Sequence, residues 1–335
     1  MTTPTHLNPH GLPAESPLLE IDRLKTYYPI RKGILSRTVG HVKAVDDISL
    51  NIFEGETVGL VGESGCGKST IGRSIVRLED PAEGRILFQN EDITRLTQKE
   101  LKPIRTQLQI IFQDPYSSLN PRKRINDILA EPFIAHRLVP RNEVQGRVDR
   151  LLDMVGLPRA YKNRYPHEFS GGQRQRIGIA RAISFEPKLI VCDEPVSALD
   201  VSIQAQILNL LADLQKELNL TYLFIAHGIG AVKYISTRIA VMYLGKIVEI
   251  GDKDELFRHP KHPYTRILLN AYPSPDPTQR SNKRIIIQGD VPSPANPPQG
   301  CRFHTRCPYV QERCRLEEPP LTGGTHAAAC HFPIN

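Results

Sequence analysis

The chain has 335 residues, of which 40% are hydrophobic and 24% are charged. This composition is typical of a folded globular protein and suffices for one large domain or two ordinary ones. No apolar run approaches the roughly 18 residues that a membrane-spanning helix needs. The polar, Pro-rich N-terminus lacks the charged and apolar regions of a secretory signal. We therefore expect a cytosolic protein whose residues 1–17 form a disordered tail.

The formal net charge of +7 leaves a nucleic-acid partner or an anionic membrane surface open. Lys and Arg are spread along the chain without a basic block, so the charge fits a merely basic globular protein equally well.

Taken in chain order, the first predicted unit is a buried strand, a glycine-rich turn and a helix, spelled "ETVGLVGESGCGKST" and "IGRSIVRL". Apolar residues then recur at helical spacing from Val144, and another helix is predicted just after Ser170, a residue suited to N-capping. "KLIVCDEP" and "TYLFIAH" are typical of buried parallel strands, with an amphipathic helix over 203–218 between them. "RIAVMYLGKIVEI" predicts a hairpin that turns at Leu244 and Gly245.

Strands that alternate with helices predict an α/β fold with a mostly parallel sheet. The largely helical stretch over about 125–168 interrupts this alternation and is predicted to be an inserted subdomain. Past Arg258 the chain becomes dense in proline and turn residues. We therefore expect an α/β domain over 18–258 and a separate, irregular tail over 259–335.

The turn between the first strand and helix matches the pattern of a phosphate-binding loop. Glycines let backbone N–H groups turn toward phosphate oxygens, Lys68 would neutralise the β and γ phosphates, and Ser69 would ligate Mg²⁺. Kinases, GTPases and many ATPases share this pattern, so alone it predicts only nucleoside triphosphate binding. The predicted ATP-binding residues of the loop are Gly62, Glu63, Ser64, Gly65, Cys66, Gly67, Lys68, Ser69 and Thr70.

Two acids, Asp193 and Glu194, end the next strongly apolar strand. One carboxylate at such a strand end can hold Mg²⁺, and its neighbour can orient or deprotonate the attacking water. A solvated strand end would look the same, but the phosphate-loop pattern upstream favours the catalytic interpretation.

"FSGGQRQR" places a hydroxyl and backbone N–H groups at a predicted helix N-terminus, which makes an anion site. A simple capped helix is the plain alternative. Because the chain already has one phosphate cradle, a second anion site makes sense if two such chains face each other and each completes the other's site. The residues are Ser170, Gly171, Gly172 and Gln173.

With these motifs in order, the chain resembles the ATP-binding-cassette (ABC) ATPases over about residues 18–260. The resemblance implies a P-loop NTPase fold with a RecA-like parallel-sheet core, an antiparallel β subdomain and the helical insertion. It implies that Gln113 in "IIFQDP" is the Q-loop glutamine that helps to hold Mg²⁺ with Ser69 and Asp193. It also implies that Asp200 belongs to the D-loop and that His227 is the switch histidine.

The resemblance further implies that Tyr28, in "LKTYYP", stacks on adenine, although Tyr27 is a rival and an ordinary packed tyrosine is the plain alternative. Gly228 departs from the family, which usually has an acidic residue after the histidine, and this puts the positioning of His227 in doubt. Cys66 and Cys192 are interpreted as small packing residues.

"DPYSSLNPRKRI", "HPYT" and "GDVPSPANPPQGCRFHTRCP" closely resemble the dipeptide and oligopeptide importer ATPases, and above all the second ATPase subunit of a dipeptide system. The resemblance implies ATP-driven uptake at the cytoplasmic face of the inner membrane. It also implies a sister ATPase, two permeases and an extracytoplasmic peptide-binding protein. Relatives serve nickel, glutathione or sugars, which leaves the ligand open.

Two other classes remain beside the importer. A nucleic-acid-associated ABC ATPase would suit the basic charge, but neither a coiled-coil insertion nor a second cassette is visible in the sequence. A non-catalytic regulatory subunit is disfavoured because Glu194 and His227 are both present.

Four cysteines, Cys301, Cys307, Cys314 and Cys330, lie in the tail and are separated by five, six and fifteen residues. Zinc fingers usually have tighter pairs, and four thiolates can also hold a [4Fe–4S] cluster, which some relatives carry in this tail. We expect a structural iron–sulfur cluster, with Zn²⁺ or free thiols as the alternatives, because so irregular a stretch buries little apolar surface.

Overall fold

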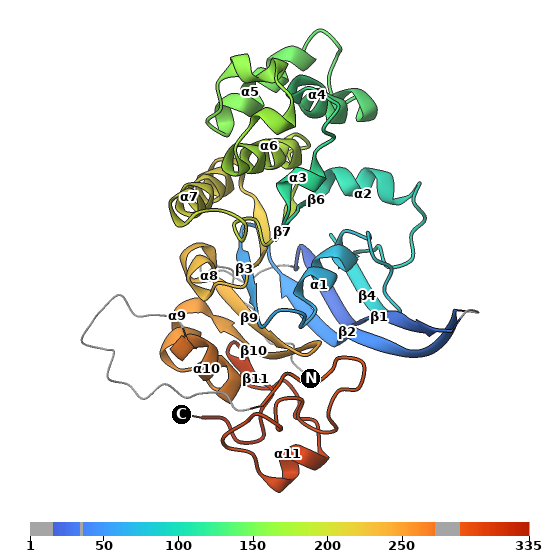
Figure 1. Cartoon of the computed structure of the whole chain (residues 1–335), viewed down its shortest axis with the longest axis vertical. Helices are drawn as coiled ribbons and strands as arrows, with labels where there is room; N and C mark the ends of the chain where they lie inside the picture. The colour runs from blue at the N-terminus through green and yellow to red at the C-terminus, as the bar shows by residue number, and fades with distance from the viewer. Residues whose placement is uncertain (1–15, 34–35, 272–288, 335) are drawn as a thin grey trace. The chain divides into compact units, whose positions relative to one another are not determined.

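The structure is a computed structural model that describes residues 16–33, 36–271 and 289–334 (Figure 1). The predicted disordered tail over 1–17 therefore lies almost wholly outside the described residues. The fold is mixed α/β with parallel and antiparallel sheets, as the sequence predicts. Two compact units divide the chain, one formed by 1–95 and 227–335 and the other by 96–226, and each is described by itself.

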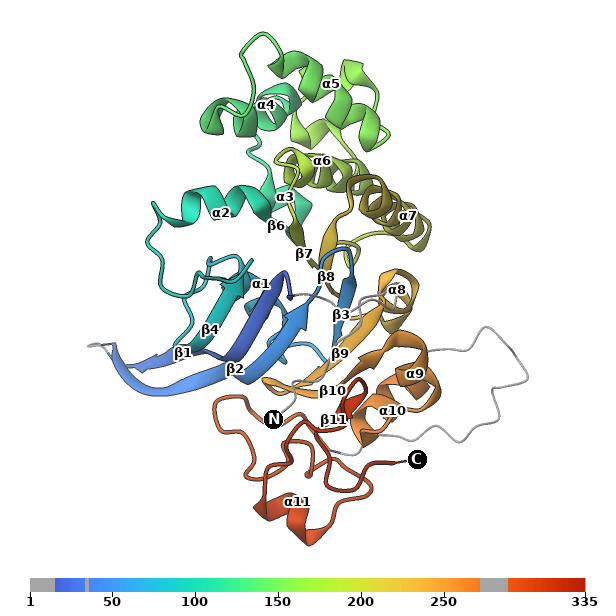
Figure 2. The ribbon, with the colours of Figure 1, turned by 180° about the vertical axis from the view of Figure 1, so that it is seen from behind.

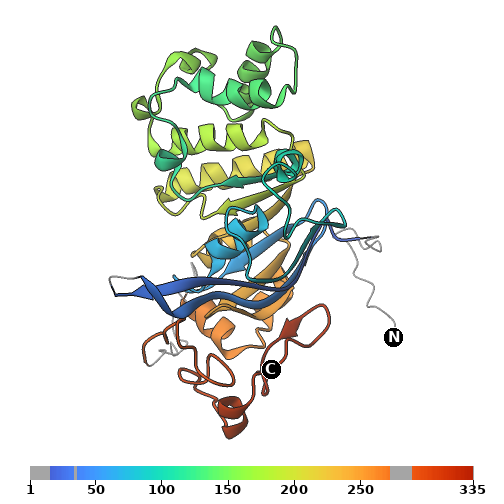
Figure 3. The same cartoon turned by 90° about the vertical axis from the view of Figure 1, so that its right-hand side faces the viewer.

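The first unit contains an antiparallel sheet in the order β2-β1-β4-β5. Its two long strands, β1 (Leu19–Lys32) and β2 (Arg37–Ile52), run side by side as a curved ribbon (Figure 3). On the other side of β1, β4 (Glu83–Phe88) pairs with β1, and β5 (Glu91–Asp92) pairs with β4. Along β1, alternate residues such as Leu19 and Ile21 are buried, which is the period-two pattern of a strand with one covered face.

The same unit contains β3 (Thr57–Val61), which pairs in parallel with β9 (Arg238–Tyr243). All five residues of β3 are buried, in keeping with its apolar sequence. β9 turns into the antiparallel β10 (Lys246–Asp252). The turn residues Leu244 and Gly245 have φ of 44° and 82°, which is the geometry of a tight hairpin, so the predicted hairpin is confirmed. Before the C-terminal tail, the helices of the first unit are α1 (Lys68–Ile75), α8 (Ile229–Ile235), α9 (Lys253–Arg258) and α10 (Pro263–Ala271).

The tail over 289–334 packs on this unit and contains only a short helix, α11 (Glu312–Leu316), and a two-residue strand, β11 (Ala327–Ala328) (Figure 2). β11 adds to β10 as an antiparallel neighbour. Phe303 is the buried apolar centre of the tail, with its ring 5.2 Å from that of Tyr243 and 5.3 Å from that of Tyr264. A small aromatic core therefore holds this irregular segment.

The second unit contains three parallel strands in the order β8-β7-β6, namely β6 (Leu108–Ile111), β7 (Leu189–Asp193) and β8 (Thr221–Ile225). β7 and β8 are buried throughout, as their apolar sequences predict. The predicted helices near Val144, after Ser170 and over 203–218 are confirmed. The helical elements are α2 (Leu101–Gln107), α3 (Pro115–Ser118), α4 (Ile125–His136), α5 (Val144–Met154), η1 (Arg159–Asn163), η2 (Pro166–Glu168), α6 (Gly171–Ile183) and α7 (Val201–Leu218).

Candidate functional site

The predicted phosphate loop lies between β3 and α1 and requires glycine at two positions. A Cβ atom on Gly67 would stand 1.9 Å from the carbonyl oxygen of Ala44, and Gly67 has φ of 107°. A Cβ atom on Gly62 would stand 2.1 Å from the carbonyl oxygen of Met242. Only glycine lets the backbone pass this close to its neighbours, so the loop is a tightly fitted backbone cradle rather than an open turn.

Lys68, the first residue of α1, curls back over this loop. Its Nζ atom donates hydrogen bonds to the carbonyl oxygens of Gly62, at 2.8 Å, and Glu63, at 3.0 Å. The side chain is only 3% exposed, so its charge is directed into the loop. The neighbouring Cys66 is buried, and burial raises the pKa of its thiol. That thiol therefore stays protonated, in agreement with its interpretation as a packing residue.

In the second unit, two predicted catalytic side chains contact each other directly. The Nε2 atom of Gln113, which follows β6, donates a 2.8 Å hydrogen bond to Oε2 of Glu194. Glu194 follows β7, is 4% exposed and has φ of 48°, a left-handed conformation that is costly for a residue with a side chain. Its backbone N–H donates to the carbonyl of Ile225 at 3.0 Å, which fixes the turn. Asp193 ends β7 and is 1% exposed.

Ser170 caps α6 through a reciprocal pair of hydrogen bonds. Its Oγ atom accepts from the backbone N–H of Gln173 at 3.4 Å, and its own N–H donates to Oε1 of Gln173 at 3.1 Å. Gly172 is packed so closely that a Cβ atom would lie 2.5 Å from Cγ2 of Ile203. The helix N-terminus is thus built and capped within the chain, with Ser170 and Gly171 on its exposed side.

Asp200 precedes α7 and accepts from the N–H of Gln204 at 2.8 Å through its backbone carbonyl. His227 is exposed, and Gly228 next to it has φ of −82° and ψ of 115°. Any residue can adopt these angles. The backbone at Gly228 therefore does not use the extra conformational freedom of glycine.

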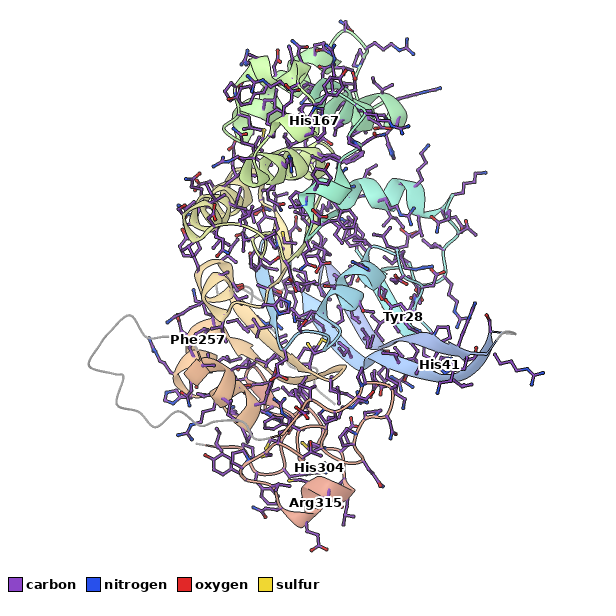
Figure 4. All side chains as sticks on the ribbon, viewed as in Figure 1. Tyr28, His41, His167, Phe257, His304 and Arg315 are labelled. Carbon is purple, nitrogen blue, oxygen red and sulfur yellow. The ribbon has the colours of Figure 1, made fainter. Side chains whose placement is uncertain are left out.

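Tyr28 is half-buried on β1 of the first unit (Figure 4). The hydroxyl of its neighbour Tyr27 donates to Asp46, and burial together with this bond raises the pKa of Tyr27. Because Tyr27 is engaged by a carboxylate, Tyr28 stays the better candidate for contact with a base.

The expected iron–sulfur cluster is wrong. Across residues 16–33, 36–271 and 289–334, no three His, Cys, Asp or Glu side chains are placed so that they could hold a metal ion. The four tail cysteines do line one pocket with His304, but its volume is about 10 Å³, close to that of one water position. Burial raises the pKa of the Cys301 thiol to about 11 and also raises the pKa of Cys307 and Cys330.

The physical premise of the cluster was that the tail lacks a core of its own, and the structure supplies other anchors. Glu249 on β10 is fully buried and accepts from the backbone N–H groups of Lys261 and His262, at 2.8 and 2.9 Å. The Nε2 atom of His326 lies 2.7 Å from the same carboxylate. Together with the Phe303 cluster, these bonds hold the tail without a metal, and the same donor geometry removes the zinc alternative.

Sequence reasoning missed two residues that contact the phosphate loop. The backbone N–H of Glu63 donates to the hydroxyl of Tyr264 at 2.8 Å, and Arg306 donates to both carboxylate oxygens of Glu63, at 2.8 and 3.2 Å. Tyr264 lies in "HPYT" and Arg306 in "HTRCP", two segments that carry the family resemblance. Neither segment predicts which of its side chains contacts the loop, more than 200 residues earlier in the chain.

Two family models match the chain. The model of the ABC transporter family matches residues 45–197, and the model described as "Oligopeptide/dipeptide transporter, C-terminal region" matches residues 248–314. The first match spans the phosphate loop, Gln113, Ser170 and Glu194, and the second spans "HPYT" and three of the tail cysteines.

Curated relatives match over nearly the whole chain. The oligopeptide transport ATP-binding protein AppF of Bacillus subtilis (strain 168) is 52% identical over 322 residues, covering 94% of this chain and 97% of AppF. OppF of Salmonella typhimurium (strain LT2), with the same description, is 50% identical over 318 residues, covering 93% of this chain and 95% of OppF.

Among solved structures, the dimeric post-hydrolysis state of the ATP-binding cassette MJ0796 bound to ADP and Pi is 28% identical, with a TM-score of 0.63 over 70% of this chain and 98% of that one. CbiO1 from Clostridium perfringens, part of an ABC transporter complex, is 30% identical, with a TM-score of 0.62 over 73% of this chain and 92% of that one. The chain belongs to the ATP-binding-cassette ATPases, in the oligopeptide/dipeptide transporter family, and is an ATP-hydrolysing transport subunit.

Proposed function

We propose that this chain powers the uptake of oligopeptides by hydrolysing ATP beneath a membrane transporter. AppF and OppF, at 52% and 50% identity, are oligopeptide transport ATP-binding proteins, and each alignment covers more than nine tenths of this chain. The observation within the molecule that carries the proposal is the 2.8 Å hydrogen bond from Gln113 to Glu194. It joins the residue predicted to help hold Mg²⁺ to the residue predicted to act on water.

In the proposed site, the glycine cradle and Lys68 hold the β and γ phosphates. The cradle fits this role because glycine at Gly62 and Gly67 lets the loop backbone pass close to its neighbours, and because the Lys68 amine donates to a carbonyl of the loop. Ser69, Gln113 and Asp193 offer the oxygen ligands that Mg²⁺ prefers. Bound Mg²⁺ would neutralise charge on the phosphates.

Glu194 would accept a proton from the attacking water. The water oxygen would form a bond to the γ phosphorus while the bond between that phosphorus and the ADP oxygen breaks. Gln113 orients the Glu194 carboxylate through the hydrogen bond between them, and His227 would contact the γ phosphate. Tyr28 would stack on the adenine base. Orientation of a water by a fixed carboxylate is worth about 10²- to 10⁴-fold in rate for general-base groups.

Ser170, Gly171, Gly172 and Gln173 would serve the ATP held by a second cassette, with Asp200 at the same interface. Family membership implies permease partners. We further propose that the second cassette is a sister ATPase, that peptides arrive through an extracytoplasmic binding protein, and that the complex works at the cytoplasmic face of the inner membrane. Within the part of the chain that the structure describes, no helix combines the length and apolarity needed to cross a bilayer.

The test is peptide uptake into proteoliposomes that contain the full transporter and enclosed ATP. Wild-type vesicles should accumulate a labelled oligopeptide, and Lys68→Ala vesicles should not, because the phosphates lose their main cationic partner. Equal uptake by both would refute the proposed site. ATP turnover that responds to nucleic acid and not to peptide would favour the nucleic-acid alternative and refute the transport role.

A further inference from the structure

Glu63, the second residue of the phosphate loop, is held by two side chains from beyond the cassette. Arg306 forms two hydrogen bonds to its carboxylate, at 2.8 Å from Nη1 and 3.2 Å from Nη2. The hydroxyl of Tyr264 accepts from its backbone N–H at 2.8 Å. One residue of the loop is therefore fixed at both its backbone and its side chain, and both contacts come from the region C-terminal to β10.

These two side chains are themselves immobilised. Tyr264 is fully buried, and its ring lies 4.7 Å from that of Tyr243 and 5.3 Å from that of Phe303. The Arg306 side chain is 8% exposed, and its Nη1 atom also lies 3.4 Å from the Tyr243 hydroxyl. A two-bond contact between a guanidinium and a carboxylate fixes direction as well as distance. The phosphate loop is thus attached to a packed cluster of aromatic side chains.

The charge at this position matters for the ligand. A carboxylate within a phosphate-binding loop repels the negative charge of ATP, and in a partly buried setting this repulsion is only weakly screened. Arg306 compensates that charge, and the carboxylate is only a quarter exposed. Lys68, the other nearby cation, donates to loop carbonyls including that of Glu63 and not to its carboxylate.

We propose that Tyr264 and Arg306 are positioning residues for nucleotide binding, through which the C-terminal extension shapes the phosphate loop and neutralises Glu63. This inference rests on the proposed role of the loop in holding ATP. It differs from a merely structural anchoring of the tail, because other contacts do that without touching the loop. Lys246, for example, binds Glu318 of the tail at 2.5 Å.

The first test measures the affinity of the purified full chain for a fluorescent ATP analogue. Arg306→Ala should weaken binding by about tenfold, as expected for loss of a charge-assisted contact. Arg306→Ala combined with Glu63→Gln should restore affinity to within about threefold of wild type, because the uncompensated charge is gone. The defect of Arg306→Ala should also shrink as salt is raised from low to high concentration.

Two controls separate the possible failures. Glu318→Ala cuts the ion pair between the tail and Lys246, which does not involve the loop, and should leave affinity unchanged. Lys68→Ala should abolish binding; if it does not, the proposed phosphate site is wrong, and this inference falls with it. If Lys68→Ala abolishes binding while Arg306→Ala binds like wild type, the phosphate site stands and the positioning role is refuted. Failure of Glu63→Gln to restore affinity would refute the charge compensation.

The second test isolates the backbone contact. Tyr264→Phe keeps the ring in its aromatic cluster and removes only the acceptor for the Glu63 N–H, so a part-buried donor loses this partner. We expect affinity for the same ATP analogue to fall by about threefold to tenfold. Tyr222→Phe is the matched control, since the Tyr222 hydroxyl is equally buried and donates to the carbonyl of Leu211 at 3.1 Å, away from the loop. Equal affinity for Tyr264→Phe and Tyr222→Phe would contradict the proposal.

Discussion

The side-chain amide of Gln113 donates a 2.8 Å hydrogen bond to the carboxylate of Glu194. The two residues are far apart in sequence and follow adjacent parallel strands, β6 and β7, whose carboxyl ends meet at one edge of the sheet. Glu194 adopts a left-handed backbone conformation at this point. The hydrogen bond thus joins Glu194, a buried acid with a strained backbone, to a side chain from the loop after the neighbouring strand. Such a bond fixes the orientation of the carboxylate.

Replacing Gln113 should disturb that orientation. In Gln113→Ala the carboxylate loses this donor, and we expect ATP hydrolysis by the assembled transporter to fall by about tenfold, the equivalent of one charge-assisted hydrogen bond. Gln109→Ala is the control, since Gln109 lies on the same strand and donates to the carbonyl of Arg105 instead. Phosphate release is the measurement, and equal rates for the two variants would contradict an orienting role.

Two glycine substitutions should have opposite effects. Gly67→Ala forces a Cβ atom to within 1.9 Å of the Ala44 carbonyl at φ of 107°, so we expect ATP binding to be lost and unfolding free energy to fall by at least about 1–3 kcal/mol. Gly178→Ala, in α6, meets no atom within 4 Å and should stabilise by about 0.5–1 kcal/mol. Chemical denaturation of both variants checks this, and a neutral Gly67→Ala would argue against the tight cradle.

His262 predicts a specific pH dependence of stability. Burial lowers its pKa to about 3, and its Nδ1 atom accepts from the backbone N–H of Tyr264 at 3.1 Å. The unfolded chain, with an ordinary histidine pKa near 6.5, binds this proton more readily than the folded chain does. Between about pH 6.5 and 3, His262 should therefore lower the unfolding free energy by about 1.4 kcal/mol per pH unit as the pH falls.

Denaturant titrations of wild type and His262→Gln at several pH values should differ by that slope. An NMR titration of the wild-type ring avoids any folding defect of the variant, and a His262 ring that titrates near pH 6.5 would contradict the buried neutral state.

The tail should fold without metal. The donor geometry excludes a metal site within the described residues, and the tail is anchored by the Glu249 network and the aromatic cluster. We expect anaerobically purified protein to contain neither iron nor zinc in proportion to chain, and chelator to leave the melting temperature unchanged. Four iron atoms per chain with visible absorption would be the opposite result.

Local sequence patterns predicted the buried strands and several helices, whereas the antiparallel sheet of β1 and β2 was expected only from the family resemblance. β7 and β8 are buried throughout and mainly apolar because both faces are covered, and Ser170 caps its helix together with Gln173, three residues later. The hairpin at Gly245 was likewise predicted from neighbouring residues, namely two apolar runs on either side of a glycine turn. Such features depend on residues within a few positions of each other, so they are visible in one sequence.

The rest depends on contacts that span long distances in the chain. The spacing of Cys301, Cys307, Cys314 and Cys330 suggested a metal, but it does not reveal the directions in which the thiols point or the volume between them. Arg306 reaches Glu63 across 243 positions, and no local period encodes that pairing. The domain boundaries at 18 and 258 remain predictions.

The central claim is that Glu194 acts on the attacking water. The most direct measurement is single-turnover phosphate release by the assembled transporter carrying Glu194→Gln, with the partner cassette's site disabled in both samples and ATP binding measured in parallel. The account predicts unchanged ATP affinity and a rate lowered by about 10²- to 10⁴-fold, within the range for a positioned general base. A wild-type rate from the Glu194→Gln site would contradict it.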